Sequence, residues 1–354
     1  MRGKSGDASG ATACATPHAS PLTPDPVPPY RAPLWLPGGH AQTIYPVLFA
    51  PRPRVAYRRE RWETPDGDFV DVDWAVADHT RTTDRGVPLV ALFHGLEGSS
   101  RSHYATSLMH AVLAAGWRGA VVHFRGCSGE PNRLPRAYHS GDSAEIDWMV
   151  RRLAADAPLL HVAGVSLGGN ALLRWLGEEG ASAARLVQCA AAISAPVDLM
   201  AAGNTLDRGF NLVYTRHFLV TMRRKALAKL ESHPRIYARD AVAAARTLRE
   251  FDDLVTAPLH GFRDTDDYWT RASSKPILRG IAVPTLVLNA RNDPFLPVSA
   301  LPSPADVSRA VTLEQPDEGG HVGFVTGRFP GELTWLPSRL LTYFRHQTCS
   351  TATG

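Results

Sequence analysis

Short apolar runs alternate with amphipathic segments along most of the chain. Continuous apolar runs are typical of strands buried on both faces, and apolar residues at helical spacing predict the helices between them. The strands are predicted at residues 87–93, 119–124, 159–165, 186–193, 284–289 and 311–315. The helices are predicted at residues 104–115, 143–155, 170–179 and 335–344. Strands that alternate with helices in this way predict an α/β fold with a mostly parallel, doubly wound sheet.

Two segments depart from this alternation. Residues 196–280 have a helical pattern rich in Arg and Ala and lie between two predicted core strands, where a lid or cap would be inserted. Residues 62–76 alternate around the turn signal Asp66-Gly67, which predicts an antiparallel hairpin at the sheet edge. We therefore expect a disordered leader (1–29), the first part of the core (30–195), a helical lid (196–280), the second part of the core (281–347) and a tail (348–354).

Charge and cysteine content narrow the classes of partner and compartment. The formal net charge is +4 over 354 residues and the basic residues are scattered, which argues against nucleic acid as a principal partner. The basic run Arg223-Arg224-Lys225 is interpreted as a solvated helix surface. The four cysteines show no disulfide framework and indicate a reducing compartment. Neither a secretory segment nor the roughly 20 apolar residues that span a bilayer are found, so we expect a cytoplasmic protein.

The segment 164–168, Gly-Val-Ser-Leu-Gly, places a serine between a predicted strand and a predicted helix. It matches the pattern Gly-x-Ser-x-Gly, in which the serine occupies a sharp, strained turn. Glycines two residues to either side avoid collisions with the neighbouring strand and helix. The turn lifts the hydroxyl clear of the sheet and points the helix N-terminus at the reacting carbonyl. Ser166 is therefore the predicted nucleophile.

A serine hydroxyl is a weak nucleophile at neutral pH and needs a base beside it. His321 lies in a Gly-rich loop after the last predicted strand and is the predicted base. Asp293 follows the strand predicted at 284–289 and is the predicted acid that orients the imidazole, which gives the chain order Ser, Asp, His. Asp198, after the preceding strand, is the alternative acid, and its other interpretation is a helix cap.

Donors for a developing oxyanion are expected in the loop 94–98, directly after a predicted strand. Because such donors are backbone N–H groups, they are assigned to Leu96 in this loop and to Leu167 after the serine. His94 is expected to brace the loop rather than to act as a second base. Cys127 is interpreted as a structural thiol, because no strand-to-helix turn surrounds it.

With these residues in place, the chain resembles the YheT-like branch of the α/β-hydrolases from about residue 33 to residue 345. The segments that carry the resemblance are 36–45, 93–98, 124–129, 164–170, 251–254, 257–262 and 289–294. The resemblance implies the α/β-hydrolase fold, carboxylic-ester hydrolysis, and Ser166, Asp293 and His321 as the charge-relay triad. Eukaryotic relatives include medium-chain phospholipases and yeast enzymes that make and break medium-chain fatty-acid ethyl esters, so acyl-chain esters are the expected substrates.

The expected function is therefore that of a serine carboxylic-ester hydrolase acting through an acyl-enzyme on short- to medium-chain acyl esters of small molecules or lipids. The first alternative is an acyltransferase that uses the same triad, and the second is a non-catalytic ligand-binding α/β-hydrolase. No metal or organic cofactor is expected, because no His, Cys and Asp cluster has metal-ligand spacing and no Gly-x-Gly-x-x-Gly follows a strand. Nothing in the sequence requires a membrane.

Overall fold

The computed structural model describes residues 27–76 and 86–351. Within them, an eight-stranded sheet has the order β1-β2-β4-β3-β5-β6-β7-β8. β1, β2 and β4 pair antiparallel in that order, and all pairs from β4 to β8 are parallel. The strands are β1 (Ala56–Glu63), β2 (Phe69–Val76), β3 (Leu89–Phe93), β4 (Arg118–Val122), β5 (Leu160–Val165), β6 (Cys189–Ile193), β7 (Thr285–Leu288) and β8 (Val311–Glu314). The predicted fold class is confirmed. Most of the predicted leader falls on residues 1–26, outside the described residues.

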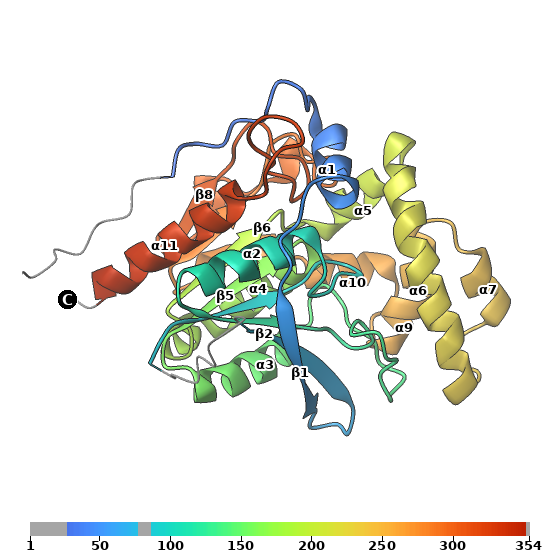
Figure 1. Ribbon diagram of the computed structural model, residues 1–354. Helices are drawn as coiled ribbons and strands as arrows, with labels where there is room; N and C mark the ends of the chain where they lie inside the picture. The colour runs from blue at the N-terminus through green and yellow to red at the C-terminus, as the bar shows by residue number, and fades with distance from the viewer. Residues whose placement is uncertain (1–26, 77–85, 352–354) are drawn as a thin grey trace, which may run out of the picture.

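Helices cover both faces of the sheet (Figure 1). The helices of one face are α2 (His103–Ala114) and α11 (Trp335–Thr351), and those of the other are α3 (Ser143–Asp156) and α4 (Leu167–Glu179). The apolar side chains of β3 alternate between the two layers, since successive residues of a strand point to opposite faces. Val90 and Leu92 pack in the cluster that includes α2 and α11, whereas Leu89, Ala91 and Phe93 pack against α3 and α4.

The hairpin of β1 and β2 is present at the sheet edge and is longer than predicted. Its register runs from Ala56 opposite Val76 to Glu63 opposite Phe69, and Gly67 in the turn has a φ of 85°. β1 begins at Ala56, before residue 62, and the sequence pattern misses residues 56–61 because they are exposed or half-buried, half of them Arg, and give no buried apolar signal.

Two helices differ from the sequence-based expectation. α1 (Gly39–Leu48) is not among the predicted helices, since it begins next to a Gly pair and contains Pro46. α11 runs to Thr351, past residue 344, so the predicted tail begins inside a helix.

The segment between β6 and β7, which we call the cap segment (196–280), is helical and builds a core of its own. Its longest helix is α6 (Leu212–Ser232), and its other α-helices are α5 (Leu199–Leu206), α7 (Arg239–Ala244), α8 (Leu248–Phe251), α9 (Ala257–Leu259) and α10 (Thr265–Ala272). A separate cluster of buried side chains joins these helices, including Leu219, Phe251 and Trp269. In Figure 1, α6 and α7 stand at the right of the molecule, away from the sheet.

The packing of the sheet core predicts that alanine substitutions of two leucines differ strongly in their effect on the free energy of unfolding. Leu92 in β3 is 0% exposed, whereas Leu34 is 101% exposed. Leu92→Ala removes buried methyl and methylene groups and leaves a cavity, so it should lower the free energy of unfolding by about 2 to 5 kcal/mol. Leu34→Ala, the matched control, should change it by less than about 0.5 kcal/mol. Urea unfolding followed by circular dichroism measures both, and equal effects would contradict the packing of β3 described above.

Candidate active site

The predicted nucleophile lies on a strained turn between β5 and α4. Ser166 has φ 52° and ψ −119°, a region that non-glycine residues rarely adopt. Its amide donates to the carbonyl oxygen of Ile193 in β6 at 2.8 Å, which fixes the turn to the sheet. A Cβ at residue 168 would lie 2.5 Å from the carbonyl oxygens of Phe93 and His94. The second glycine of the motif is therefore required by the close approach of α4 to the end of β3.

The structure brings Ser166, His321 and Asp293 into one hydrogen-bonded chain. His321 Nε2 lies 2.9 Å from Ser166 Oγ, and His321 Nδ1 lies 2.8 Å from Asp293 Oδ2. An ionised carboxylate only accepts, so Nδ1–H donates to Asp293 and Nε2 is left to accept the serine hydroxyl proton. The Asp293 side chain is 1% exposed, and its other oxygen accepts the Phe295 amide at 2.8 Å. The Phe295 ring also stacks on the imidazole at a centroid distance of 4.0 Å.

Side chains of α1 hold the loop that carries His321. The His321 amide donates to Thr43 Oγ1 at 2.8 Å, and the Gly319 amide donates to Gln42 Oε1 at 2.8 Å. The Gly320 amide donates to Asn292 Oδ1 at 2.9 Å. None of Gln42, Thr43 and Asn292 is among the predicted site residues. Their signal in the sequence is the pair of segments 36–45 and 289–294, which the resemblance singles out.

The loop after β3 lies next to the serine turn and carries one amide without a hydrogen-bond partner among the described residues. The Gly95 amide donates to the Tyr104 hydroxyl and the Glu97 amide to the Tyr138 hydroxyl, both at 2.9 Å. The Leu96 amide between them donates to no other group of the residues that the structure describes, and the same is true of the Leu167 amide at the N-terminus of α4. Two free N–H groups at this position, one of them at a helix N-terminus, can receive a developing negative charge.

His94 braces this loop, as predicted from its place at the end of a strand. It is fully buried, and its Nδ1 donates to the Gly95 carbonyl oxygen at 2.8 Å. Its Nε2 accepts the Phe124 amide at 3.1 Å. Burial, together with the neighbouring His123, lowers the pKa of His94 to about 3, so the ring is neutral. Both nitrogens are occupied, which leaves none for a second base.

The rival residues have structural contacts instead. Asp198 caps α5, since its Oδ1 accepts the Ala201 amide at 3.0 Å, while His321 turns to Asp293. Burial raises the pKa of the Cys127 thiol to about 11, which keeps it protonated and unreactive at neutral pH. Among the residues described, no group of three or more His, Cys, Asp or Glu is arranged to hold a metal ion.

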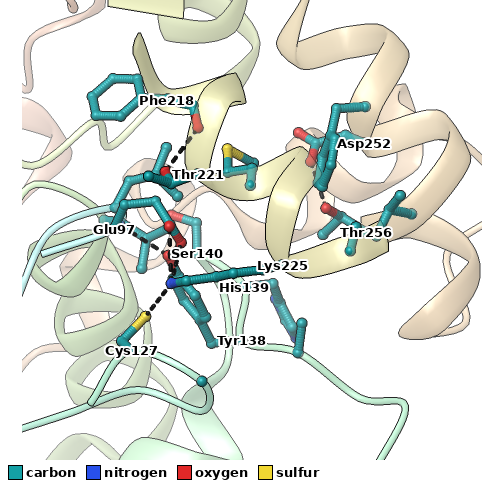
Figure 2. A pocket seen from close by; sticks show the side chains of 18 of the residues that line it. Glu97, Cys127, Tyr138, His139, Ser140, Phe218, Thr221, Lys225, Asp252 and Thr256 are labelled. Atoms are coloured by element: carbon teal, nitrogen blue, oxygen red, sulfur yellow. Dashed lines mark hydrogen bonds and ion pairs between the residues drawn. The ribbon is translucent and has the colours of Figure 1, made fainter. Parts of the chain in front are cut away.

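A cavity of about 660 Å³ lies between the serine turn and the cap segment, with Ser166 and His321 in its wall. Its lining is mostly apolar, and α6 contributes residues between Phe218 and Lys229. Figure 2 shows Phe218, Thr221 and Lys225 of this helix at the cavity. The other apolar lining residues include Leu199, Leu206, Phe251, Val255, Trp269 and Phe295. The volume is within the range of about 300 to 1,000 Å³ that is common for small-molecule pockets.

The interpretation of residues 223–225 as a solvated surface is wrong for Lys225. Arg224 is exposed and borders the cavity, and Lys225 lines it, whereas Arg223 donates to the carbonyl oxygens of Ala243 and Ala245. Each step along a helix turns the side chain by about 100°, so Arg223 and Lys225 point in different directions. Lys225 Nζ contacts both carboxylate oxygens of Glu97, at 2.9 and 2.8 Å. A run of basic residues in a helix is thus divided between two faces.

The chain matches the family model described as the alpha/beta hydrolase fold over residues 88–328. It is 40% identical to "Putative esterase YheT" of Escherichia coli K12, across 88% of this chain and 92% of that protein. It is 31% identical to "Phospholipase ABHD3" of Homo sapiens, across 87% of this chain and 76% of that protein.

The fold also resembles solved structures. An esterase of Pyrococcus furiosus superposes with a TM-score of 0.51 at 16% identity, covering 84% of this chain and 97% of that one. This likeness supports the fold alone, whereas the family model covers Ser166, Asp293 and His321. The chain therefore belongs to the α/β-hydrolase fold family, in its YheT-like branch.

Proposed function

We propose that this chain, a carboxylic ester hydrolase by its family, cleaves acyl esters through a covalent acyl-enzyme on Ser166. The observation that carries the proposal is the unbroken hydrogen-bond chain from Asp293 through His321 to Ser166 at the wall of an apolar cavity. A nucleophile, a base that touches it and a buried acid that fixes the base are the parts that acyl transfer needs.

In this mechanism, His321 Nε2 accepts the hydroxyl proton as Ser166 Oγ attacks the ester carbonyl carbon. The carbonyl oxygen becomes an oxyanion, and the amides of Leu96 and Leu167 stabilise it. The tetrahedral intermediate then collapses, and the alcohol leaves with the proton from His321 Nε2. Water enters, loses a proton to the same nitrogen, and releases the acid from the serine. Asp293 stays ionised throughout and stabilises the imidazolium that forms twice in each cycle.

The proposed substrates are short- to medium-chain acyl esters of small molecules or lipids. The cavity is closed on one side by α6 and lined mainly by apolar side chains, and the cap segment is the proposed lid. Each methylene that moves from water into such a lining contributes about 0.8 kcal/mol to binding. The names of two relatives, an esterase and a phospholipase, agree with this class of substrate.

We also propose a cytoplasmic location. Two free thiols, Cys127 and Cys189, are buried in the core, which suits a reducing compartment. In the described ranges, no helix has the length and apolar character needed to cross a membrane. Cell fractionation with an antibody to the chain should find it with the cytoplasmic markers, and recovery from a secreted fraction would contradict the proposal.

The triad predicts a graded loss of activity. Ser166→Ala should lower kcat on p-nitrophenyl esters by about 10⁴-fold or more, because no other group supplies the nucleophile. Asp293→Asn should cost about 10³- to 10⁴-fold, because it disorients the base without removing it. Initial rates at a protein concentration taken from absorbance measure both effects, and a fluorophosphonate should label the wild type but not Ser166→Ala.

The control for the acid is Asp198→Asn, which keeps a good helix cap and should leave kcat within about twofold of the wild type. A large loss in Asp198→Asn with little loss in Asp293→Asn would reverse the assignment of the acid. Undiminished turnover by Ser166→Ala would refute the acyl-enzyme on that serine.

Because α6 lines the cavity, a bulky substitution on its cavity side should change the preference for the length of the acyl chain. Thr221 lines the cavity, whereas Val220, its neighbour in the helix, is 59% exposed. Thr221→Trp fills part of the acyl space, so the ratio of kcat/KM for p-nitrophenyl octanoate to that for acetate should fall by about tenfold or more, the equivalent of two buried methylenes. Val220→Trp adds the same bulk on the solvent side and should leave this ratio unchanged. Equal ratios in the two variants would place the acyl chain elsewhere.

A further inference from the structure

The loop that carries the Leu96 amide is held on both sides of that amide. The Gly95 amide donates to the Tyr104 hydroxyl and the Glu97 amide to the Tyr138 hydroxyl. The Tyr138 hydroxyl in turn donates to Glu97 Oε1 at 2.9 Å. Burial raises the pKa of Tyr138 well above its usual value, so the phenol keeps the proton that it donates. The Tyr138 hydroxyl is thus hydrogen-bonded to both the backbone amide and the side-chain carboxylate of Glu97.

Glu97 is held in an unfavourable backbone conformation. Its φ is 55°, in the left-handed region where a side chain is disfavoured. Such a conformation persists only where surrounding contacts determine it. Here those contacts converge on the carboxylate, whose side chain is 9% exposed. The backbone conformation of residue 97 fixes the orientation of the peptide bond between residues 96 and 97. The Leu96 amide belongs to the peptide bond immediately before that one.

The counter-ion of Glu97 comes from the cap segment. Lys225 Nζ in α6 lies 2.9 Å from Oε1 and 2.8 Å from Oε2 of Glu97, and 3.5 Å from Cys127 Sγ. Figure 2 shows Lys225 extending from α6 to Glu97, with Tyr138 and Cys127 beside it. Because the Cys127 thiol is protonated, the carboxylate is the charged partner of Lys225. The helix that lines the acyl cavity is therefore ion-paired to the loop of the oxyanion donor.

We propose that Lys225 and Glu97 are positioning residues of the oxyanion hole. Their ion pair makes the position of the Leu96 amide depend on the position of α6. The inference rests on the proposed function. An acyl chain that packs against α6 then also fixes the donor that meets the tetrahedral intermediate. Loss of the pair releases the strained residue 97 and moves an N–H that acts only in the transition state. Loss of the ion pair should therefore lower kcat and leave KM nearly unchanged, because binding of the ester in the ground state does not depend on that donor.

The test is the split between kcat and KM in Lys225→Met and Glu97→Gln. Each variant should lower kcat on the best p-nitrophenyl ester by about 10- to 100-fold, the loss that follows from displacing a catalytic group by about 1 Å. KM should stay within about threefold. An alkyl trifluoromethyl ketone of the same chain length, which forms a tetrahedral adduct, should lose affinity by the same factor as kcat/KM. Lys225→Arg keeps the positive charge and should recover most of the loss.

The control is Arg223→Met in the same helix. Arg223 donates to the carbonyl oxygens of Ala243 and Ala245 within the cap segment and does not reach the loop of Leu96. This variant should loosen the cap segment but leave kcat within about twofold. A loss of kcat in Arg223→Met equal to that in Lys225→Met would show a general effect of cap stability and would overturn the inference.

A double variant tests whether the two residues act through one contact. If they do, Lys225→Met combined with Glu97→Gln should lose no more kcat than the worse single variant, whereas multiplied losses would overturn the inference. Wild-type kcat in both single variants, or a change in KM alone, would also overturn it. If Lys225→Met does not fold by circular dichroism, Glu97→Gln, which preserves the size of the side chain, decides the question. Absence of ester turnover by the wild type would instead refute the proposed function.

Discussion

The contact on which the site depends is the close approach of α4 to the end of β3. At residue 168 the backbone passes so near the carbonyl oxygens of Phe93 and His94 that no side chain fits. This contact places the serine turn after β5 beside the loop after β3. The carboxyl ends of two neighbouring parallel strands thereby bring the candidate nucleophile and one proposed oxyanion donor together. The other parts of the site come to these strand ends from α1, from the loops after β7 and β8, and from the cap segment.

The sheet and the candidate serine and histidine were predictable because their signals are local. An apolar run, a Gly-x-Ser-x-Gly turn and a histidine in a Gly-rich loop can each be recognised within a few residues, and chain order links them. Asp198 and Asp293 follow successive strands, so local pattern alone could not separate them. Only the folded loop shows that the Asp293 carboxylate is fixed by the Phe295 amide and faces the imidazole.

The supporting contacts were not predictable, since they join residues far apart in the chain. Thr43 holds the His321 amide across 278 residues, and Lys225 meets Glu97 across 128. No periodicity reports such a pairing, and a helix that begins beside a Gly pair and contains a proline is a poor helix in any propensity scale. Lys225 also occurs in a basic run whose average character is solvated. The candidate catalytic residues are thus easier to predict from sequence than the residues that hold them in place.

Insertion of the cap segment between β6 and β7 leaves the sheet intact, because these two strands remain hydrogen-bonded neighbours. A segment attached in this way could be exchanged between relatives to change the accepted acyl group. The pairing of Glu97 with Lys225 limits that freedom: a transplanted segment without a cation at this point would enclose an uncompensated carboxylate beside the serine turn. Substitution at residue 97 and replacement of α6 must therefore be made together in any chimera, and the two positions should vary together in evolution.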